Sequence, residues 1–143
     1  MHGVQITTFT AAEEAEKNLA AGEAGRNHHL LRAEEYIRSH LRNPISLRDL
    51  TEATGTSPST LLRTFNTHYG VSPLQYVKLL GLQAVRRSLL DSDSLGSTVS
   101  GVASEYGFRQ LGRFSADYRK VYGELPSVTL RRHRHRLSDT KGL

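Results

Sequence analysis

The fold of this chain follows from the stretch Leu47-Arg48-Asp49-Leu50-Thr51-Glu52-Ala53-Thr54-Gly55, which leads into Leu61, Phe65, Gly70 and Pro73. The short segment before the glycine alternates apolar and polar residues at helical spacing. The apolar residues after the glycine lie four positions apart, which puts them on one face of a second helix. The pattern is typical of a short helix, a glycine turn and an amphipathic helix.

The same pattern occurs a second time, in Val99-Ser100-Gly101-Val102-Ala103-Ser104-Glu105-Tyr106-Gly107 followed by Phe114, Tyr118, Gly123 and Pro126. Phe65 follows its turn glycine by 10 positions in the first copy, and Tyr118 follows its turn glycine by 11 in the second. The next glycine follows after five residues and the proline after three more, in both copies. Two helix-turn-helix units predict an all-α fold that binds double-stranded DNA in the major groove.

The composition limits the class of protein. A chain of 143 residues with 37% hydrophobic residues can bury one ordinary core or two small ones. No apolar run is long enough to span a membrane, and residues 1–20 show no signal-peptide pattern, so we expect a soluble, cytoplasmic protein without membrane contact. The absence of cysteine excludes disulfides and thiolate chemistry.

The positive charge is concentrated on the segment that carries the repeat. Formal net charge is +5, and residues 28–136 contain 16 basic against 9 acidic side chains, whereas residues 1–27 are net acidic. Mild basicity alone is also typical of a well-solvated surface. Combined with the repeated unit, it indicates a polyanionic partner.

The patterns predict about seven helices in two helix-turn-helix subdomains joined by a long linker helix. We expect residues 1–27 to form a flexible linker or arm. The remaining divisions are the first subdomain at 28–71, the linker helix at 72–91, the second subdomain at 92–136 and a tail at 137–143.

Turn and capping residues set the expected helix ends. A first helix runs from Leu30 to Asn43-Pro44, and Ser46 and Thr98 cap the helices that open the two copies. Ser72-Pro73 begins the linker helix, which at about 18 residues would span roughly 27 Å, enough to hold two reading helices about one turn of DNA apart. Gly81 lies within this helix and lowers its stability by about 1 kcal/mol relative to alanine. Its presence there has either close packing or nothing evident as its reason.

The end of the chain is strongly basic. We expect a short last helix from Ser127 to about Arg132 and a frayed basic end over residues 131–136 and the tail.

In the first copy the solvent side of the second helix is the expected base-reading face. Leu61, Phe65 and Tyr69 must face the core, so the opposite stripe presents side chains at steps of three and four. Arg63 is the first choice, because arginine gives two hydrogen bonds to guanine O6 and N7. The stripe comprises Ser59, Leu62, Arg63 and Asn66.

The second copy should read fewer bases directly. Gly112 and Ala116 lie on its outward stripe and have no polar reach, so readout depends on Arg113, Arg109 and Gln110, with DNA bending as a further source of specificity. Phosphate contacts without sequence preference are expected from Ser57, Thr60, Lys78, Arg119, Lys120 and Arg131.

No catalytic, metal or cofactor site is predicted. His28, His29, His133 and His135 lie in end segments without a third ligand at fixed spacing, so they are interpreted as solvated side chains. No serine, histidine and acid combination has a supporting motif, and no glycine-rich loop follows a strand. We expect a binding protein and no enzyme.

Four stretches give the chain a family resemblance from about residue 30 to residue 132. They are residues 45–50, residues 55–61, residues 71–76, and above all Gly107-Phe108-Arg109-Gln110-Leu111-Gly112-Arg113-Phe114 with its continuation to Ser127. In order, capping and spacing they resemble the DNA-binding domain of AraC/XylS-type bacterial transcription regulators.

The resemblance implies a seven-helix domain and a transcriptional activator that touches RNA polymerase beside its promoter site. It also implies an effector-binding or dimerising domain ahead of this one, so the chain would be a fragment of a longer regulator or a short stand-alone member. The alternative is a helical protein-interaction module with little DNA affinity, which Gly112 and Ala116 would suit because small residues permit close helix contact.

Overall fold

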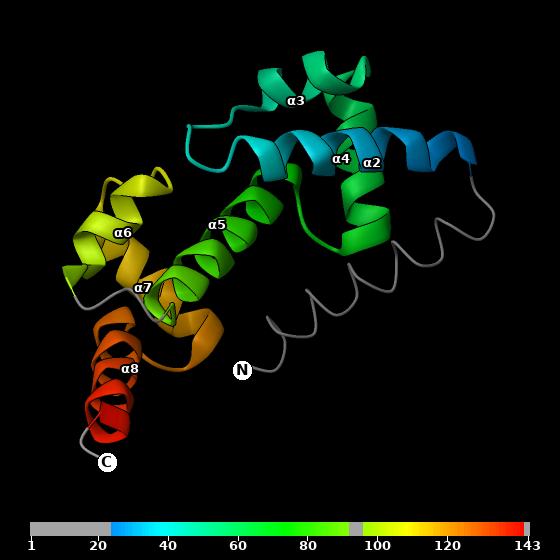
Figure 1. Cartoon of the computed structure of the whole chain (residues 1–143). Helices are drawn as coiled ribbons and strands as arrows, with labels where there is room; N and C mark the ends of the chain where they lie inside the picture. Colours follow the sequence, from blue (N-terminus) through cyan, green and yellow to red (C-terminus); the bar gives the residue numbers. More distant parts are fainter. Residues whose placement is uncertain (1–23, 92–95, 142–143) are drawn as a thin grey trace. The chain divides into compact units, whose positions relative to one another are not determined.

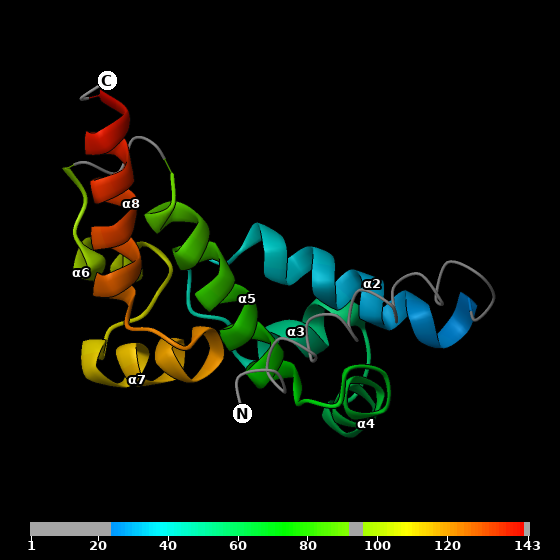
Figure 2. The ribbon, with the colours of Figure 1, turned by 90° about the horizontal axis from the view of Figure 1, so that it is seen from below.

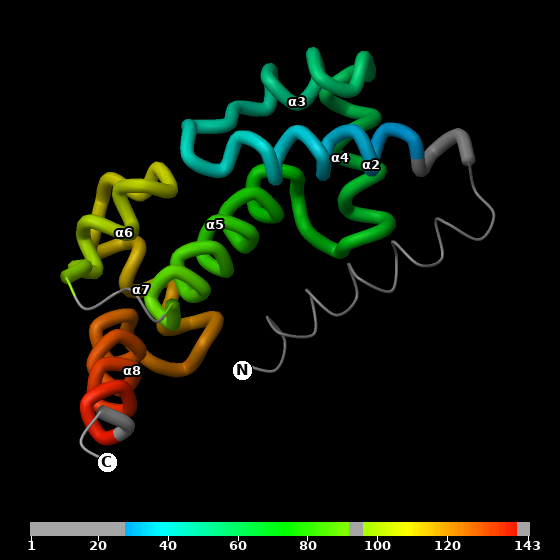
Figure 3. The backbone as a smooth tube through the Cα atoms, viewed as in Figure 1, coloured from blue at the N-terminus to red at the C-terminus, as the bar shows by residue number. Residues whose placement is uncertain are grey.

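The computed structural model describes residues 24–91 and 96–141, and in these ranges every regular element is a helix (Figure 1). The helices are α2 (Ala24–Ser39), α3 (Leu47–Thr54), α4 (Pro58–Tyr69), α5 (Pro73–Leu89), α6 (Val99–Glu105), α7 (Leu111–Tyr122) and α8 (Pro126–Lys141). The predicted all-α class with two helix-turn-helix pairs, α3–α4 and α6–α7, is confirmed. Figure 3 traces the same path along the backbone.

The described residues group into two compact units, residues 24–80 and residues 81–91 with 96–141. The division falls inside α5, between Leu80 and Gly81. The predicted subdomain limits at residues 71 and 92 stay predictions. The arm expected at residues 1–27 lies mostly outside the described residues.

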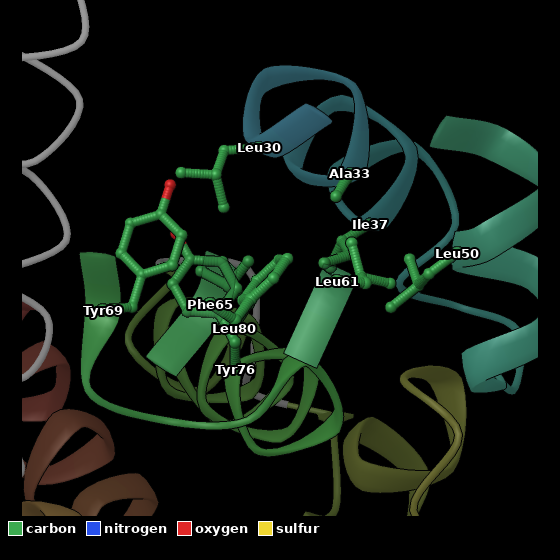
Figure 4. Packing of buried hydrophobic residues seen from close by; sticks show 9 residues of the cluster. All are labelled: Leu30, Ala33, Ile37, Leu50, Leu61, Phe65, Tyr69, Tyr76 and Leu80. Atoms are coloured by element: carbon green, nitrogen blue, oxygen red, sulfur yellow. The ribbon is translucent and has the colours of Figure 1, made fainter. Parts of the chain in front are cut away.

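The unit of residues 24–80 is built on a cluster of apolar side chains from four helices (Figure 4). Helix α2 packs against α3 and α4, and α3 packs against α4. The helical period of each segment brings its apolar residues to the shared interior. The cluster comprises Leu30, Ala33, Ile37, Leu50, Leu61, Phe65, Tyr69, Tyr76 and Leu80.

Local capping explains where α3 begins and ends. Ser46 Oγ accepts from the Asp49 backbone N–H, and the Asp49 carboxylate accepts from the Ser46 N–H across 2.9 Å. The predicted cap at Ser46 is confirmed, and the reciprocal bond from Ser46 to Asp49 makes it a capping box. Gly55 ends the helix with φ 69°, a left-handed conformation in which glycine carries no steric penalty. Gly107 (φ 81°) turns the chain at the equivalent place of the second copy.

The unit of residues 81–141 repeats this plan. Helices α6, α7 and α8 pack against one another, and α8 runs away from α7 in Figure 2. Thr98 Oγ1 accepts from the Gly101 N–H across 3.0 Å, so the second predicted cap is confirmed. The buried side chains include Leu82, Val85, Leu89, Val102, Phe114, Tyr118, Val121 and Leu130.

Close packing is the reason for the glycine inside α5. A Cβ atom added at Gly81 would lie 3.0 Å from Phe108 Cζ and 3.2 Å from Phe108 Cε2. The Phe108 ring, which also packs on Phe114, therefore occupies the space of the missing side chain. Of the two reasons left open by the sequence, this contact supports the first.

The first helix ends earlier than expected. Helix α2 stops at Ser39, and a tight turn with hydrogen bonds from the His40 and Asn43 N–H groups carries the chain to Pro44. Ser39 Oγ donates to the Glu35 carbonyl and the His40 ring bonds the Tyr36 carbonyl. Local side-chain bonds of this kind compete with continuation of a helix. The helix also begins at Ala24, ahead of the predicted Leu30.

The prediction of a short last helix with a frayed basic end was wrong. Helix α8 continues to Lys141, and two residues at its middle make contacts that are distant in sequence. The His133 ring bonds the Asp91 carbonyl across 2.8 Å, and the Arg134 guanidinium donates to the Ser97 carbonyl. His135 lies 3.5 Å from Asp139 one helical turn later. A pattern of charges alone does not reveal such anchors.

Candidate nucleic-acid interface

Helix α4 presents the predicted base-reading stripe on its solvent side. Leu61, Phe65 and Tyr69 are buried, so the helix can turn only its opposite face outward. All four predicted residues on that face are exposed, with Leu62 at 39%. The exposed Leu62 beside Arg63 suits a surface that contacts both a thymine methyl group and the acceptor atoms of guanine.

The start of α4 is closed by a capping hydroxyl, with Pro58 at its first position. Ser57 Oγ accepts from the Thr60 N–H across 3.3 Å and donates to Thr60 Oγ1 across 3.0 Å. Both hydroxyls are therefore engaged in the cap. A phosphate at this end would meet the positive end of the helix and the hydroxyl groups.

Helix α7 is the corresponding element of the second unit. Phe114, Tyr118 and Val121 are buried, while Arg113 and the small residues Gly112 and Ala116 are exposed. No heavy atom lies within 4 Å of a Cβ built at Gly112, so this part of the helix surface is open. An open, small-residue surface lets a helix approach a groove wall closely.

The turn before α7 carries two exposed polar side chains. Gln110 is the residue at the N-cap position, but its side chain makes no capping hydrogen bond. Arg109 next to it is also exposed. Both side chains are therefore exposed to solvent, which the predicted base reading requires.

The predicted phosphate contacts fall on several elements. Arg119 and Lys120 are exposed in the last turn of α7, and Arg131 is exposed on α8. Lys78 is half-buried in the first part of α5. Arg119, Lys120 and Arg131 share one unit, whereas Lys78, Ser57 and Thr60 belong to the other.

The arginines chosen as base readers are exposed on the outward helix faces and in the turn before α7. Among the described residues, Arg63, Arg109 and Arg113 form no ion pair. Two exposed arginines outside this set do form ion pairs: Arg48 with Glu52, and Arg132 with Glu124. A free guanidinium on an exposed helix face is what contact with guanine or phosphate requires.

A polar network on the buried side of α7 was not predictable from the sequence. The Arg86 guanidinium donates to Tyr118 Oη across 3.2 Å and lies 3.8 Å from Glu124 Oε2. Arg86 and Tyr118 are 32 positions apart, so no local spacing rule could have paired them. The only signal available was the position of Arg86 beside the buried Val85 on an otherwise apolar helix face.

The described residues offer little for metal chemistry. Within residues 24–91 and 96–141 no group of three His, Cys, Asp or Glu side chains is placed to hold an ion. His133 bonds a backbone carbonyl, and His135 faces a carboxylate.

None of the described helices is both long and apolar enough to cross a membrane.

These features define a double helix-turn-helix DNA-binding class of protein. The family model described as a helix-turn-helix domain matches residues 50–132. In the crystal structure of a probable AraC family transcriptional regulator from Rhodopseudomonas palustris, 36% of aligned residues are identical, with a TM-score of 0.68 over 73% of this chain and 96% of that one. The chain belongs to the AraC/XylS-type family of DNA-binding transcription regulators.

Two activators from Pseudomonas putida are among the similar proteins. XylDLEGF operon transcriptional activator 2 is 36% identical over 110 residues, which are 77% of this chain and 70% of that protein. The XylDLEGF operon transcriptional activator is 38% identical over 100 residues, which are 70% of this chain but 31% of that protein. The chain thus spans about a third of the length of the second relative.

Membership of this family makes double-stranded DNA the partner of the chain. It also favours the DNA-binding interpretation over the helical protein-interaction module considered from the sequence.

Proposed function

We propose that the chain activates transcription by inserting α4 and α7 into successive major grooves of its DNA site. The observation that carries this proposal is the matched exposure of two outward helix faces, each on the second helix of a helix-turn-helix pair. Each face carries an arginine that forms no ion pair within residues 24–91 and 96–141. The names of the two Pseudomonas putida relatives support activation as the outcome.

Each residue has a proposed role. Arg63 and Arg113 read guanine, Leu62 contacts a thymine methyl group, and Gln110 bonds a base edge. Ser59, Asn66 and Arg109 add base or phosphate contacts. The phosphate group comprises Ser57, Thr60, Lys78, Arg119, Lys120 and Arg131, which position the protein without reading sequence.

The proposal extends to the partners of the whole protein. An activator of this class would touch RNA polymerase beside the promoter and would act in the bacterial cytoplasm, where the DNA lies. The greater length of the second Pseudomonas putida relative supports an accompanying effector-binding or dimerising domain. The chain itself is proposed to bind DNA without enzymatic turnover.

Selection of bound duplexes from a random pool, followed by sequencing, tests the reading faces directly. Two clusters of enriched positions about 10 base pairs apart are expected, since one turn of DNA separates successive major grooves on one side. Enrichment of a single cluster, or of none, would contradict the two-helix proposal.

A salt titration separates DNA binding from a protein-interaction role. The logarithm of the association constant should fall linearly with the logarithm of salt, with a slope of about −0.9 for each phosphate contacted. The absence of any gel shift on random duplex at low salt and micromolar protein would instead favour the interaction module.

A further inference from the structure

Arg86 contacts two aromatic residues on the inner side of α7. Its guanidinium donates to Tyr118 Oη across 3.2 Å and lies 4.7 Å from the centre of the Tyr122 ring. Tyr118 and Tyr122 are one helical turn apart, so the contact spans the second half of the helix. Burial raises the pKa of Tyr122 to about 12, which is consistent with a ring enclosed by its neighbours.

Glu124 closes the same network from the turn between α7 and α8. Its side chain is 15% exposed and lies 3.8 Å from Arg86, and it accepts from Thr129 Oγ1 and from the Arg132 guanidinium. Thr129 Oγ1 in turn hydrogen-bonds Tyr118 Oη across 2.8 Å. The Glu124 carboxylate thus links Arg86 of α5 to Thr129 and Arg132 of α8. Arg86 and Thr129 also hydrogen-bond Tyr118 of α7.

The network lies on the side of α7 opposite Arg113. At 100° per residue, Tyr118 and Tyr122 project about 140–180° around the helix from Arg113. Any rotation of α7 about its axis would therefore break contacts to Arg86 and move the Arg113 guanidinium along the DNA. A bidentate contact tolerates little displacement, because both hydrogen bonds must form together.

We propose that Arg86 and Glu124 are positioning residues that fix the rotation of α7 and so determine which base edge Arg113 reaches. The inference rests on the proposed function, in which α7 reads bases. The planar fork of Arg86 and the carboxylate of Glu124 are both required, because an ammonium or an amide cannot reproduce the geometry and charge of the pair.

Duplex selection on Arg86→Lys and Glu124→Gln tests the proposal. We call the enriched base positions read by α7 the α7 cluster and those read by α4 the α4 cluster. In each variant we expect the base preference at the strongest position of the α7 cluster to fall about tenfold, which is the lower end of what one bidentate contact discriminates. The α4 cluster should stay as sharp as in the unaltered protein, since Arg63 lies in the other unit. An α7 cluster that stays sharp in both variants would overturn the proposal.

Two control variants separate positioning from general weakening. Arg87→Lys makes the same change at the exposed neighbour of Arg86 and should leave both clusters sharp. Val121→Ala removes a buried side chain from α7 and lowers the melting temperature while keeping Arg86 and Glu124. Selections are run well below the melting temperature of every variant. Loss of preference in Val121→Ala equal to that in Arg86→Lys would assign the effect to stability and overturn the proposal.

The unaltered protein separates failure of this inference from failure of the proposed function. If it enriches no α7 cluster, base reading by α7 is wrong and the inference falls with it. If it enriches both clusters and the network variants do too, the inference alone is wrong. Should Arg86→Lys fail to fold by circular dichroism, Glu124→Gln decides the outcome.

Discussion

Tyr76 donates a hydrogen bond to Glu34 Oε1 across 3.0 Å, joining residues that are 42 positions apart in the chain. Glu34 is only 5% exposed and also accepts from Arg38 across 2.8 Å. Two partners thus compensate a carboxylate buried between α2 and the first part of α5. Burial, followed by the neighbouring Glu34 charge, raises the pKa of the Tyr76 hydroxyl well above its ordinary value, so it remains a donor.

Tyr76→Phe should lower the free energy of unfolding of this unit by about 1–3 kcal/mol, because a buried acceptor loses one of its donors. Urea denaturation followed by circular dichroism measures the change. Tyr36→Phe is the matched control, since the half-buried Tyr36 hydroxyl makes no hydrogen bond among the described residues. Equal effects of the two changes would contradict a role for the Glu34 contact.

Gly81→Ala should destabilise the protein, although alanine gains about 1 kcal/mol over glycine in a helix. The added Cβ meets Phe108 at 3.0 Å, and overpacking of this kind costs about 1–3 kcal/mol. In a Phe108→Leu background the same change should become neutral or stabilising. A double-mutant cycle in urea measures the coupling, and the absence of any coupling would show that the ring does not limit position 81.

Asp49→Asn should remove an acid-dependent part of the stability of α3. Hydrogen bonds first from the Ser46 backbone N–H and then from its hydroxyl lower the pKa of Asp49 below 3.8. A lowered pKa in the folded state means that the contribution is complete above pH 3.8 and disappears as pH falls through the lower value. The difference in urea midpoint between the two proteins should therefore shrink below pH 3.8. A difference that does not vary between pH 2 and 7 would contradict this account.

Arg63→Ala should relax preference at one base position by about 1–3 kcal/mol. Arg119→Ala should instead weaken binding to all sequences alike and reduce the magnitude of the salt slope by about 0.9. Titrations against a selected duplex and its single-base variants measure both effects. Arg48→Ala, an exposed α3 arginine paired with Glu52, serves as the control for Arg63 and should leave preference unchanged. Undiminished preference in Arg63→Ala would assign base reading to other residues.

Much of the local structure was predictable from short-range chemistry. The caps at Ser46 and Thr98 and the apolar face of α4 depend on residues within a few positions of one another. Helical periodicity places Leu61 and Phe65 inside, which leaves Arg63 outside whatever the rest of the fold does. The reading faces of both copies therefore follow from the pattern, although their contacts with DNA stay predictions.

The sequence by itself determined the helical class, the two repeated turns and the side of α4 and α7 that faces solvent, because spacing along a helix is set by its period. Only the tertiary structure revealed the Phe108 ring against Gly81, the full length of α8 and the network of Arg86, Tyr118 and Glu124. These features depend on groups that are distant in sequence and meet only after helices pack. Burial and directed hydrogen bonds between the packed helices stabilise these contacts, and no residue pattern along the chain predicts them.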